Sequence, residues 1–414
     1  MTDVAPINLP ALPLLTCPYC AHAVPDGPFC GVCGAHLTHP AEQVAARRPH
    51  AYAAFPNESV LRLSIVTSLL PQLGHRSKSP FRMTFGLIAT LLVILALADL
   101  EAPLIAVSAL GVPLLFQLYI FEVDPYESNY LIPTIVLFGL GAGLGVGWAL
   151  IGGPVVTEAL RPQLAGTLTG GQALNAAVAV PVVGQVLMCV PVVLLRLART
   201  ARTEALDGFT AGVTGALGFT LAATLAELTS RLSDGISAHQ PFLSLLTEAL
   251  IRGVSVPLVA AATTGFVGAA LWSRRGGMSA AGGRWLASPV VALVVALAIQ
   301  VGVGFTDVAG LSDPVLLLVH LTAVCLALVA VRIGVHHVLL HEARQGGAVS
   351  VGSPRVCPHC QHVVPAMPFC PHCGVAEHAT ARSQRRRSTA RAVATHASSA
   401  PSGSDTSELG NDEP

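Results

Sequence analysis

Eight apolar stretches, each near the length that crosses a lipid bilayer, follow one another through most of this 414-residue chain. A transmembrane helix needs about 20 predominantly apolar residues to cross the ~30 Å hydrocarbon layer. Hydrophobic residues make up 52% of the chain and charged residues only 11%, so a water-soluble globule would leave much apolar surface uncovered. We therefore predict an all-α polytopic membrane protein in contact with membrane lipid. The stretches are residues 83–98, 102–121, 131–152, 173–195, 208–228, 249–272, 286–305 and 314–334.

The positive charges predict how these helices are oriented. Arginine and lysine gather before the first stretch, after the fourth, between the sixth and seventh and around the end of the eighth, whereas the alternate loops are mainly acidic. Under the positive-inside rule, this bias places both termini in the cytoplasm of a cell in whose plasma membrane the chain is embedded. The exceptions are an acidic loop at 122–130 and the three arginines Arg161, Arg231 and Arg252. The residues that carry the bias are Arg76, Lys78, Arg82, Arg196, Arg199, Arg202, Arg274, Arg275, Arg284, Arg332 and Arg344.

Eight of the ten cysteines form two sets with identical spacing, one near each end of the chain. Each set is a pair of Cys-x-x-Cys motifs separated by nine residues, and Cys357 lies 340 positions after Cys17. His22, Val24, Pro25, Pro28 and Phe29 recur at the same offset, so one module occurs twice. Two residues between cysteines let a tight turn offer two thiolates to one ion, and the nine-residue connection brings the second pair across. The predicted ligands are Cys17, Cys20, Cys30, Cys33, Cys357, Cys360, Cys370 and Cys373.

These modules predict two small zinc ribbons, each holding one structural Zn²⁺. Zinc binding supplies folding energy that an 18-residue segment lacks on its own. Two disulfides per module are the alternative, but thiols stay reduced in the cytoplasm. Four sulfurs already close each site, so His22 and His362 are expected outside the ligand sets. Ribbons of this kind usually contact proteins, and no basic and aromatic surface flanks them, so we expect a protein partner and no nucleic acid.

The remaining features divide the chain into five parts. They are a ribbon at 1–38, a linker at 39–80 with one short amphipathic helix near 58–73, a membrane domain at 81–341, a ribbon at 342–379 and a disordered tail at 380–414. No signal peptide is expected at the start. Cys189 and Cys325 lie within apolar helices, where a cysteine usually serves as a small packing residue.

Three segments of the membrane domain carry recognisable motifs. They are Asp207-Gly208 through Gly215 to Gly218-Phe219, Pro181 through Met188, and Arg252 through Pro257 to Thr264-Gly265. In order and spacing these segments resemble the PrsW-type intramembrane metalloproteases, over roughly residues 80–340. The resemblance implies a helical membrane fold. It also implies a zinc ion held by glutamates and intramembrane histidines, which activates water against a peptide bond.

The residues that this chemistry needs are missing at the positions that align. Where the family has a Glu-Glu pair this chain has Gly184 and Gln185, and Met188 stands at the lysine position. Ala223 stands at the position of a further glutamate and Ala260 at that of a histidine. A catalytic zinc site needs about three protein ligands, a bound water and a base. We therefore assign no catalytic residue. We predict a non-catalytic relative, a pseudoprotease, whose ribbons bind a partner, and whether the chain is an enzyme stays open.

Two alternatives remain at this stage. Glu227 lies one helical turn after Ala223, and His320 lies inside the eighth stretch, so a Glu227–His320 pair is half of a displaced metal site in a divergent but active protease. The second alternative is a small-molecule transporter built on the glycine-rich third stretch. His336, His337 and His341 are interpreted as a cluster facing lipid headgroups, or at most a weak metal patch.

Overall fold

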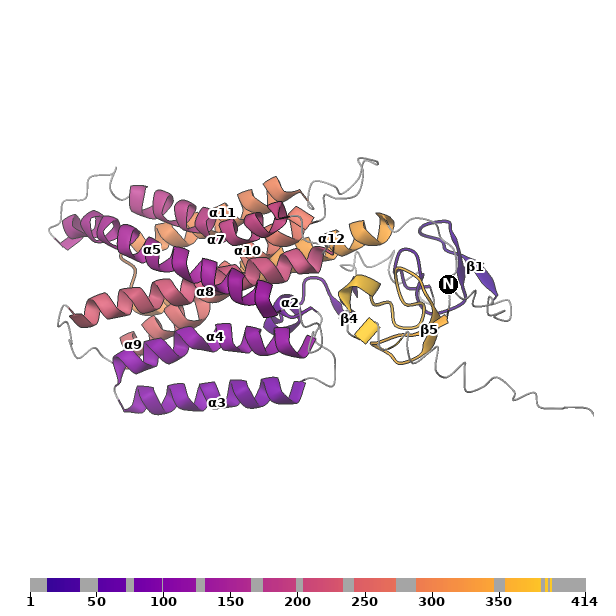
Figure 1. The fold of residues 1–414 in the computed structure, drawn as a ribbon, viewed down its shortest axis with the longest axis horizontal. Coiled ribbons are helices and arrows are strands. Elements are labelled where there is room, and N and C mark those ends of the chain that lie inside the picture. Colours follow the sequence, from indigo (N-terminus) through magenta and orange to yellow (C-terminus); the bar gives the residue numbers. More distant parts are fainter. Residues whose placement is uncertain are drawn as a thin grey trace, which may run out of the picture.

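The computed structural model describes residues 13–37, 51–71, 78–98, 100–123, 131–164, 174–198, 204–233, 242–272, 288–345, 354–380, 384–385 and 388. A bundle of long helices forms one part of the molecule, and the two ribbons lie together at one end of it (Figure 1). The helices of the bundle are α3 (Lys78–Leu97), α4 (Glu101–Val123), α5 (Leu131–Leu164), η2 (Asn175–Ala179) with α7 (Val180–Leu197), α8 (Ala205–Ser233), α9 (Phe242–Leu250) with η3 (Ile251–Ser255) and α10 (Val256–Trp272), α11 (Pro289–Val308), and α12 (Asp313–Gln345).

These helices match the eight predicted stretches and confirm a polytopic all-α membrane protein. Seven of the described helices are long and apolar enough to cross a membrane, and α3 holds a shorter apolar segment, Met83–Leu97. The position of the ribbons bears on whether α3 crosses the membrane, because an odd number of crossings would place the two ribbons on opposite sides of it. Both ribbons lie at the same end of the bundle (Figure 1), and the 20 residues of α3 extend about 30 Å. An eighth crossing by α3 would fit this arrangement.

Small residues bring the central helices into close contact. A Cβ atom added at Gly141 or Gly145 of α5 would collide with the backbone of α8, and one at Gly212 of α8 would collide with the backbone of α10. Such small-residue contacts drive helix association in lipid, where apolar side chains gain little from meeting one another. The glycines Gly139, Gly143 and Gly147 on α5 have no neighbour within 4 Å of an added Cβ. Gly141 and Gly145 are therefore the glycines of this stretch that serve helix packing.

The last helix is longer than the sequence predicts. It was expected to end near residue 334, where histidines and a glutamate begin, but α12 continues to Gln345. Val338 and Leu339 are buried in this extension, and His336 is 5% exposed. At 33 residues, α12 extends about 50 Å and passes well beyond a ~30 Å hydrocarbon layer. The polar residues continue the helix because other parts of the chain cover them.

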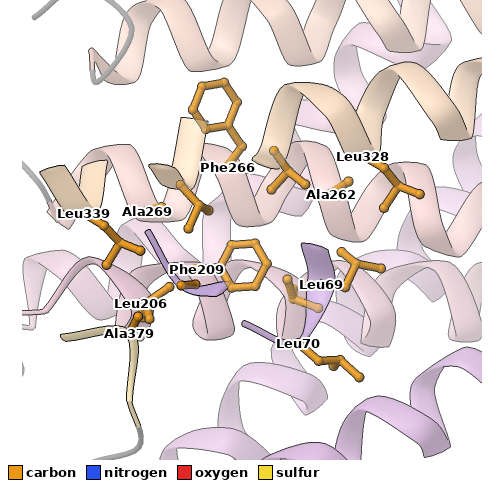
Figure 2. Packing of buried hydrophobic residues seen from close by; sticks show 14 of the residues in the cluster. Leu69, Leu70, Leu206, Phe209, Ala262, Phe266, Ala269, Leu328, Leu339 and Ala379 are labelled. Carbon is orange, nitrogen blue, oxygen red and sulfur yellow. The ribbon is translucent and has the colours of Figure 1, made fainter. Parts of the chain in front are cut away.

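The expected linker contains ordered structure of its own. A hairpin of β3 (Ala51–Tyr52) and β4 (Phe55–Ser59) precedes α2 (Ile65–Leu69), and α2 falls within the region where a short helix was expected. Ser64 caps α2, its hydroxyl accepting a hydrogen bond from the Thr67 N–H at 3.4 Å. Leu69 and Leu70 pack into the same buried cluster as side chains of α8, α10 and α12 (Figure 2). The hairpin and α2 are hereafter called the docking segment, residues 51–71.

Candidate functional site

The two ribbons repeat one backbone path. In the first, β1 (Leu14–Thr16) pairs antiparallel with β2 (Ala23–Pro25), and in the second β5 (Pro354–Val356) pairs with β6 (Val363–Pro365) in the same register. After the second cysteine pair, Gly34 and Gly374 have φ of 74° and 73°. Glycine adopts this left-handed conformation without the steric penalty of a side chain. The repeated sequence therefore produces repeated geometry down to the closing turn.

The structure gathers the eight predicted cysteines into two four-sulfur sites. Within each site, one ligand atom from every cysteine lies within 4.8 Å of the others. The sulfur separations are 3.8 Å for Cys17–Cys33 and 3.7 Å for Cys20–Cys30. A tetrahedral ion with Zn–S bonds of about 2.3 Å would separate its sulfurs by about 3.8 Å. A disulfide would bring two of them to about 2 Å. The sites therefore have the dimensions of structural zinc centres, and the same holds for Cys357–Cys373 at 3.8 Å and Cys360–Cys370 at 3.9 Å.

Backbone amides point at the sulfurs of the first site, and the contact between Cys30 and Cys33 shifts the pKa values of these two thiols in opposite directions, raising that of Cys33. The N–H groups of Tyr19 and Val32 lie 3.4 Å from the sulfurs of Cys17 and Cys30. Hydrogen bonding with Cys33 lowers the pKa of the Cys30 thiol to about 5. Thiolate is the form that binds a metal, so binding releases the remaining protons. The donor set thus fits zinc, which would serve here as a folding centre because four sulfurs leave no open position.

The two ribbon histidines expected outside the ligand sets are exposed in the structure. The Nδ1 atom of His22 is 2.7 Å from the Cys20 carbonyl oxygen, and that of His362 is 2.9 Å from the Cys360 carbonyl oxygen. A carbonyl oxygen only accepts, so Nδ1 carries the proton in both rings. Neither histidine belongs to a four-sulfur site among the described residues.

The ribbons bind each other through reciprocal contacts. The N–H of Phe29 donates to the Pro371 carbonyl at 3.0 Å, and the N–H of Phe369 donates to the Gly31 carbonyl at 2.9 Å. Phe29 and Phe369 are equivalent positions of the repeat, as are Gly31 and Pro371. The two hydrogen bonds are therefore related by an approximate twofold axis. The only signal in the sequence was the repeated phenylalanine.

Glycines complete this interface. An added Cβ at Gly34 would lie 2.8 Å from the Phe369 ring, and one at Gly374 would lie 2.6 Å from the Phe29 ring. Each ring thus packs over the glycine that closes the other ribbon. Met367 of the second ribbon is 3% exposed and packs among the buried residues of the first. The two ribbons form one paired unit, hereafter the ribbon pair.

The docking segment connects the ribbon pair to α12. The Ala53 carbonyl accepts a hydrogen bond from the Ala376 N–H at 2.9 Å, and the Ala53 N–H donates to His336 Nδ1 at 3.1 Å. Because His336 is buried and bonded to this hairpin, the interpretation of His336 as part of a headgroup-facing cluster is wrong. Arg385 adds an ion pair to Glu204 at 2.6 Å, at the start of α8. Most of the tail predicted to be disordered lies outside the described residues, which include only 384–385 and 388 beyond residue 380.

A buried arginine forms the centre of the connection. Arg332 of α12 is 1% exposed, and its guanidinium lies 2.6 Å from the Glu58 carboxylate. It also donates to Thr67 Oγ1 at 2.7 Å, and its Cζ lies 4.3 Å from the centre of the Tyr52 ring. Burial acts to raise the pKa of Glu58, but hydrogen bonds from Arg332 and Thr67 outweigh it and lower that pKa. Arg332, one of the residues that carry the predicted orientation bias, is thus a buried partner of the docking segment.

In the membrane core, the residue at a glutamate position of the PrsW-type proteases, Gln185, belongs to a closed polar network. Gln185 of α7 is fully buried. Its amide nitrogen donates to Thr264 Oγ1 at 3.1 Å and lies 3.5 Å from the Cys189 sulfur. Its carbonyl oxygen accepts from Thr263 Oγ1 at 3.0 Å and from the Gln300 amide at 3.1 Å. The network joins α7, α10 and α11 and satisfies both donors and both lone pairs of the amide.

Apolar side chains fill the neighbouring positions. Met188 and Ala260, at the family's lysine and histidine positions, are buried in one cluster with Ala216 and Phe219. Trp148 of α5 packs against this cluster from its rim. Among the described residues, groups of three or more metal-capable side chains occur in the ribbons and not in the membrane core.

Glu227 and His320 have separate partners. Arg252 lies 2.5 Å from Glu227 and 2.9 Å from Glu248. His320 contacts Asp307 through Nε2 at 2.9 Å and Ser255 Oγ through Nδ1 at 3.3 Å. The half metal site considered from sequence is thus not assembled in this structure.

The Asp307–His320–Ser255 contact has the residue types of a hydrolase relay but lacks an accessible nucleophile. Ser255 is 1% exposed, and its hydroxyl also donates to the His320 carbonyl at 3.3 Å. Catalysis would need an open space about 3 Å from the nucleophile for the reacting carbonyl. The interhelical hydrogen bond expected for His320 is the role that these contacts support.

Together, these features define a multi-pass helical membrane protein whose paired four-cysteine ribbons dock on one end of the bundle. Comparison with known families then identifies the bundle: residues 132–331 match the model of the PrsW family intramembrane metalloproteases. This match spans most of the membrane domain and confirms the resemblance to the PrsW family seen in the sequence. No curated protein and no solved structure matches the chain.

Proposed function

We propose that this protein is a non-catalytic PrsW-family member in which the membrane domain serves as a scaffold and the ribbon pair recruits a protein partner. The observation that carries the proposal is the Gln185 network. At neutral pH an amide neither releases nor accepts a proton, so Gln185 can be neither the base nor an anionic zinc ligand. All four of its hydrogen-bonding valences are used within the protein.

The apolar neighbours support the same conclusion. Met188, Ala216, Phe219 and Ala260 pack together where an open zinc site would need ligands and a bound water. Charged groups are costly inside a membrane and are retained mainly where function requires them. A membrane core that has replaced them with Gln, Met and Ala is consistent with a structural role.

Activity against a membrane substrate tests this proposal. The purified protein is reconstituted in liposomes with a single-span substrate, and an active PrsW-type protease in the same liposomes serves as the control. We expect the substrate to remain intact. Cleavage that is lost in Glu227→Gln or His320→Ala would overturn the proposal, because it would show that a displaced site works.

The ribbon pair is the part of the molecule that we propose meets a protein partner in the cytoplasm. The first ribbon exposes Leu14 (60%) and Tyr19 (41%), and the second exposes Val363 (64%). A photo-crosslinking amino acid at Leu14 or Val363 is expected to yield a defined protein adduct in cells. The same label at Met83, which is 74% exposed on α3, should yield only lipid adducts. Lipid adducts or none from both ribbon positions would contradict partner binding.

The proposed orientation has its own test. Reporter fusions at residue 1 and residue 414 should both report the cytoplasm, because the ribbons share one end of the bundle and the arginine bias points inward. Opposite signals would mean an odd number of crossings and would exclude α3 as a span.

A further inference from the structure

The second ribbon carries a further set of metal-capable side chains beside its four-sulfur site. One ligand atom from each of Cys360, His362 and His372 lies within 4.8 Å of the other two. Both histidines are exposed, whereas Cys360 is half-buried. Their rings stack with centroids 3.6 Å apart and planes inclined by 17°. The three groups therefore converge at the surface, where a dissolved ion reaches them.

The contacts prepare His362 to act as a ligand. Its Nδ1 atom is 2.9 Å from the Cys360 carbonyl oxygen, which only accepts hydrogen bonds. Nδ1 therefore holds the proton, and the lone pair of the neutral ring lies on Nε2. A backbone carbonyl that orients a histidine in this way is the usual outer support of a metal-binding imidazole.

A sulfur that binds one zinc ion keeps lone pairs for a second. Ligand–metal distances of about 2.3 Å for sulfur and about 2.0 Å for imidazole nitrogen separate ligand atoms by roughly 3.3–3.8 Å in a tetrahedron. The three atoms need to approach by at most about 1.5 Å from the 4.8 Å limit. Exposed imidazoles reach this separation by rotating about their side-chain bonds.

The first ribbon supplies a built-in comparison. Cys20 and His22 occupy the positions of Cys360 and His362, but Val32 stands at the position of His372. The His22 ring makes the same contact with its own ribbon backbone, at 2.7 Å from the Cys20 carbonyl oxygen. The two ribbons thus share the fold and the four-sulfur site and differ in one ligand of the additional set.

We propose that the second ribbon binds an additional, exchangeable Zn²⁺ ion through His362 and His372, with the Cys360 sulfur bridging it to the structural ion. Two imidazoles and a thiolate suit zinc and other late first-row divalent ions. The remaining coordination position faces solvent, so this ion exchanges more readily than one enclosed by four sulfurs.

Zinc titration of the full-length protein in detergent tests the proposal. The protein is first washed with a chelator that leaves the two structural ions in place, and Zn²⁺ is then added in competition with a chromophoric indicator. We expect one further ion to bind wild type, at least tenfold weaker binding in His372→Val, and a similar loss in His362→Gln. The chelator-resistant content of two ions should persist in both variants, which shows that the ribbons still fold.

The reverse substitution tests sufficiency. Val32→His introduces the missing ligand into the first ribbon, and it should add one exchangeable ion to the wild-type number. Equal zinc binding by wild type and His372→Val would overturn the proposal, because other surface histidines would then account for the uptake. Loss of a chelator-resistant ion in His372→Val would also overturn it, since His372 would then belong to the structural site.

Discussion

Glu58→Gln is the substitution that most directly tests how the ribbon end is joined to the membrane domain. It removes the carboxylate charge that lies 2.6 Å from the Arg332 guanidinium, which is 1% exposed. Truncating one partner of a buried ion pair costs about 3–5 kcal/mol because the other charge is left uncompensated. The Glu58 side chain is 18% exposed, so water replaces part of the interaction and we expect the lower end, about 3 kcal/mol.

Thermal unfolding of the purified protein, followed by intrinsic fluorescence at neutral pH, measures this loss. For a chain of 414 residues, a change of about 3 kcal/mol corresponds to a fall in Tm of roughly 3–4 °C. Glu227→Gln is the matched control, because it removes the same charge from a pair in which Arg252 and Glu227 are 25% and 44% exposed. Arg252 also keeps its ion pair with Glu248 at 2.9 Å, so no guanidinium is left uncompensated and this control should lower Tm only slightly.

A double variant separates the charge from the shape. Arg332→Met combined with Glu58→Gln removes both charges, and it should be more stable than Glu58→Gln alone because no buried guanidinium is left without its carboxylate. The reasoning is refuted if Glu58→Gln lowers Tm no more than Glu227→Gln does. It is also refuted if the double variant is as unstable as Glu58→Gln.

Three further results are expected. The Glu342 carboxylate, 3.6 Å from His378, raises the pKa of His378. The stabilisation from this pair is therefore complete below pH about 6.5 and is lost as the pH rises through the raised pKa. His378→Gln should flatten the fall of Tm as the pH rises above about 6.5, and an unchanged profile would exclude this pair as its source. Gln185→Ala removes the donor to Thr264 Oγ1 and the acceptor of the half-buried Gln300 amide, whereas Thr263 keeps its bond to the Val259 carbonyl. This change should lower the free energy of unfolding by about 2 kcal/mol, without any change in proteolysis. A stability equal to wild type would mean that water replaces the amide. Elemental analysis after chelator washing should find two zinc ions in wild type and none in Cys17→Ser with Cys357→Ser, whereas full retention by the double variant would disprove the ligand sets.

The parts of the structure that follow from local sequence were predicted well. Helix positions follow from runs of about 20 apolar residues, because the bilayer imposes that length on any span. The cysteine sets and their identical folds follow from spacing alone, because a tetrahedral ion accepts few arrangements of four sulfurs. Gln185, Met188 and Ala260 could be singled out against the PrsW motifs because the chemistry demands particular side chains at those positions.

The long-range pairings are what the tertiary structure alone decided. Nothing local to Arg332 or Glu58 indicates that they meet, because 274 positions separate them and each looks like an ordinary charged residue near a membrane surface. The same holds for the reciprocal contacts of Phe29 and Phe369, since a repeated sequence does not specify that its copies face each other. Sequence determines which residues can cross a bilayer or bind zinc. The fold decides which buried charge finds a partner, because that depends on segments that the chain brings together only when all of its helices have packed.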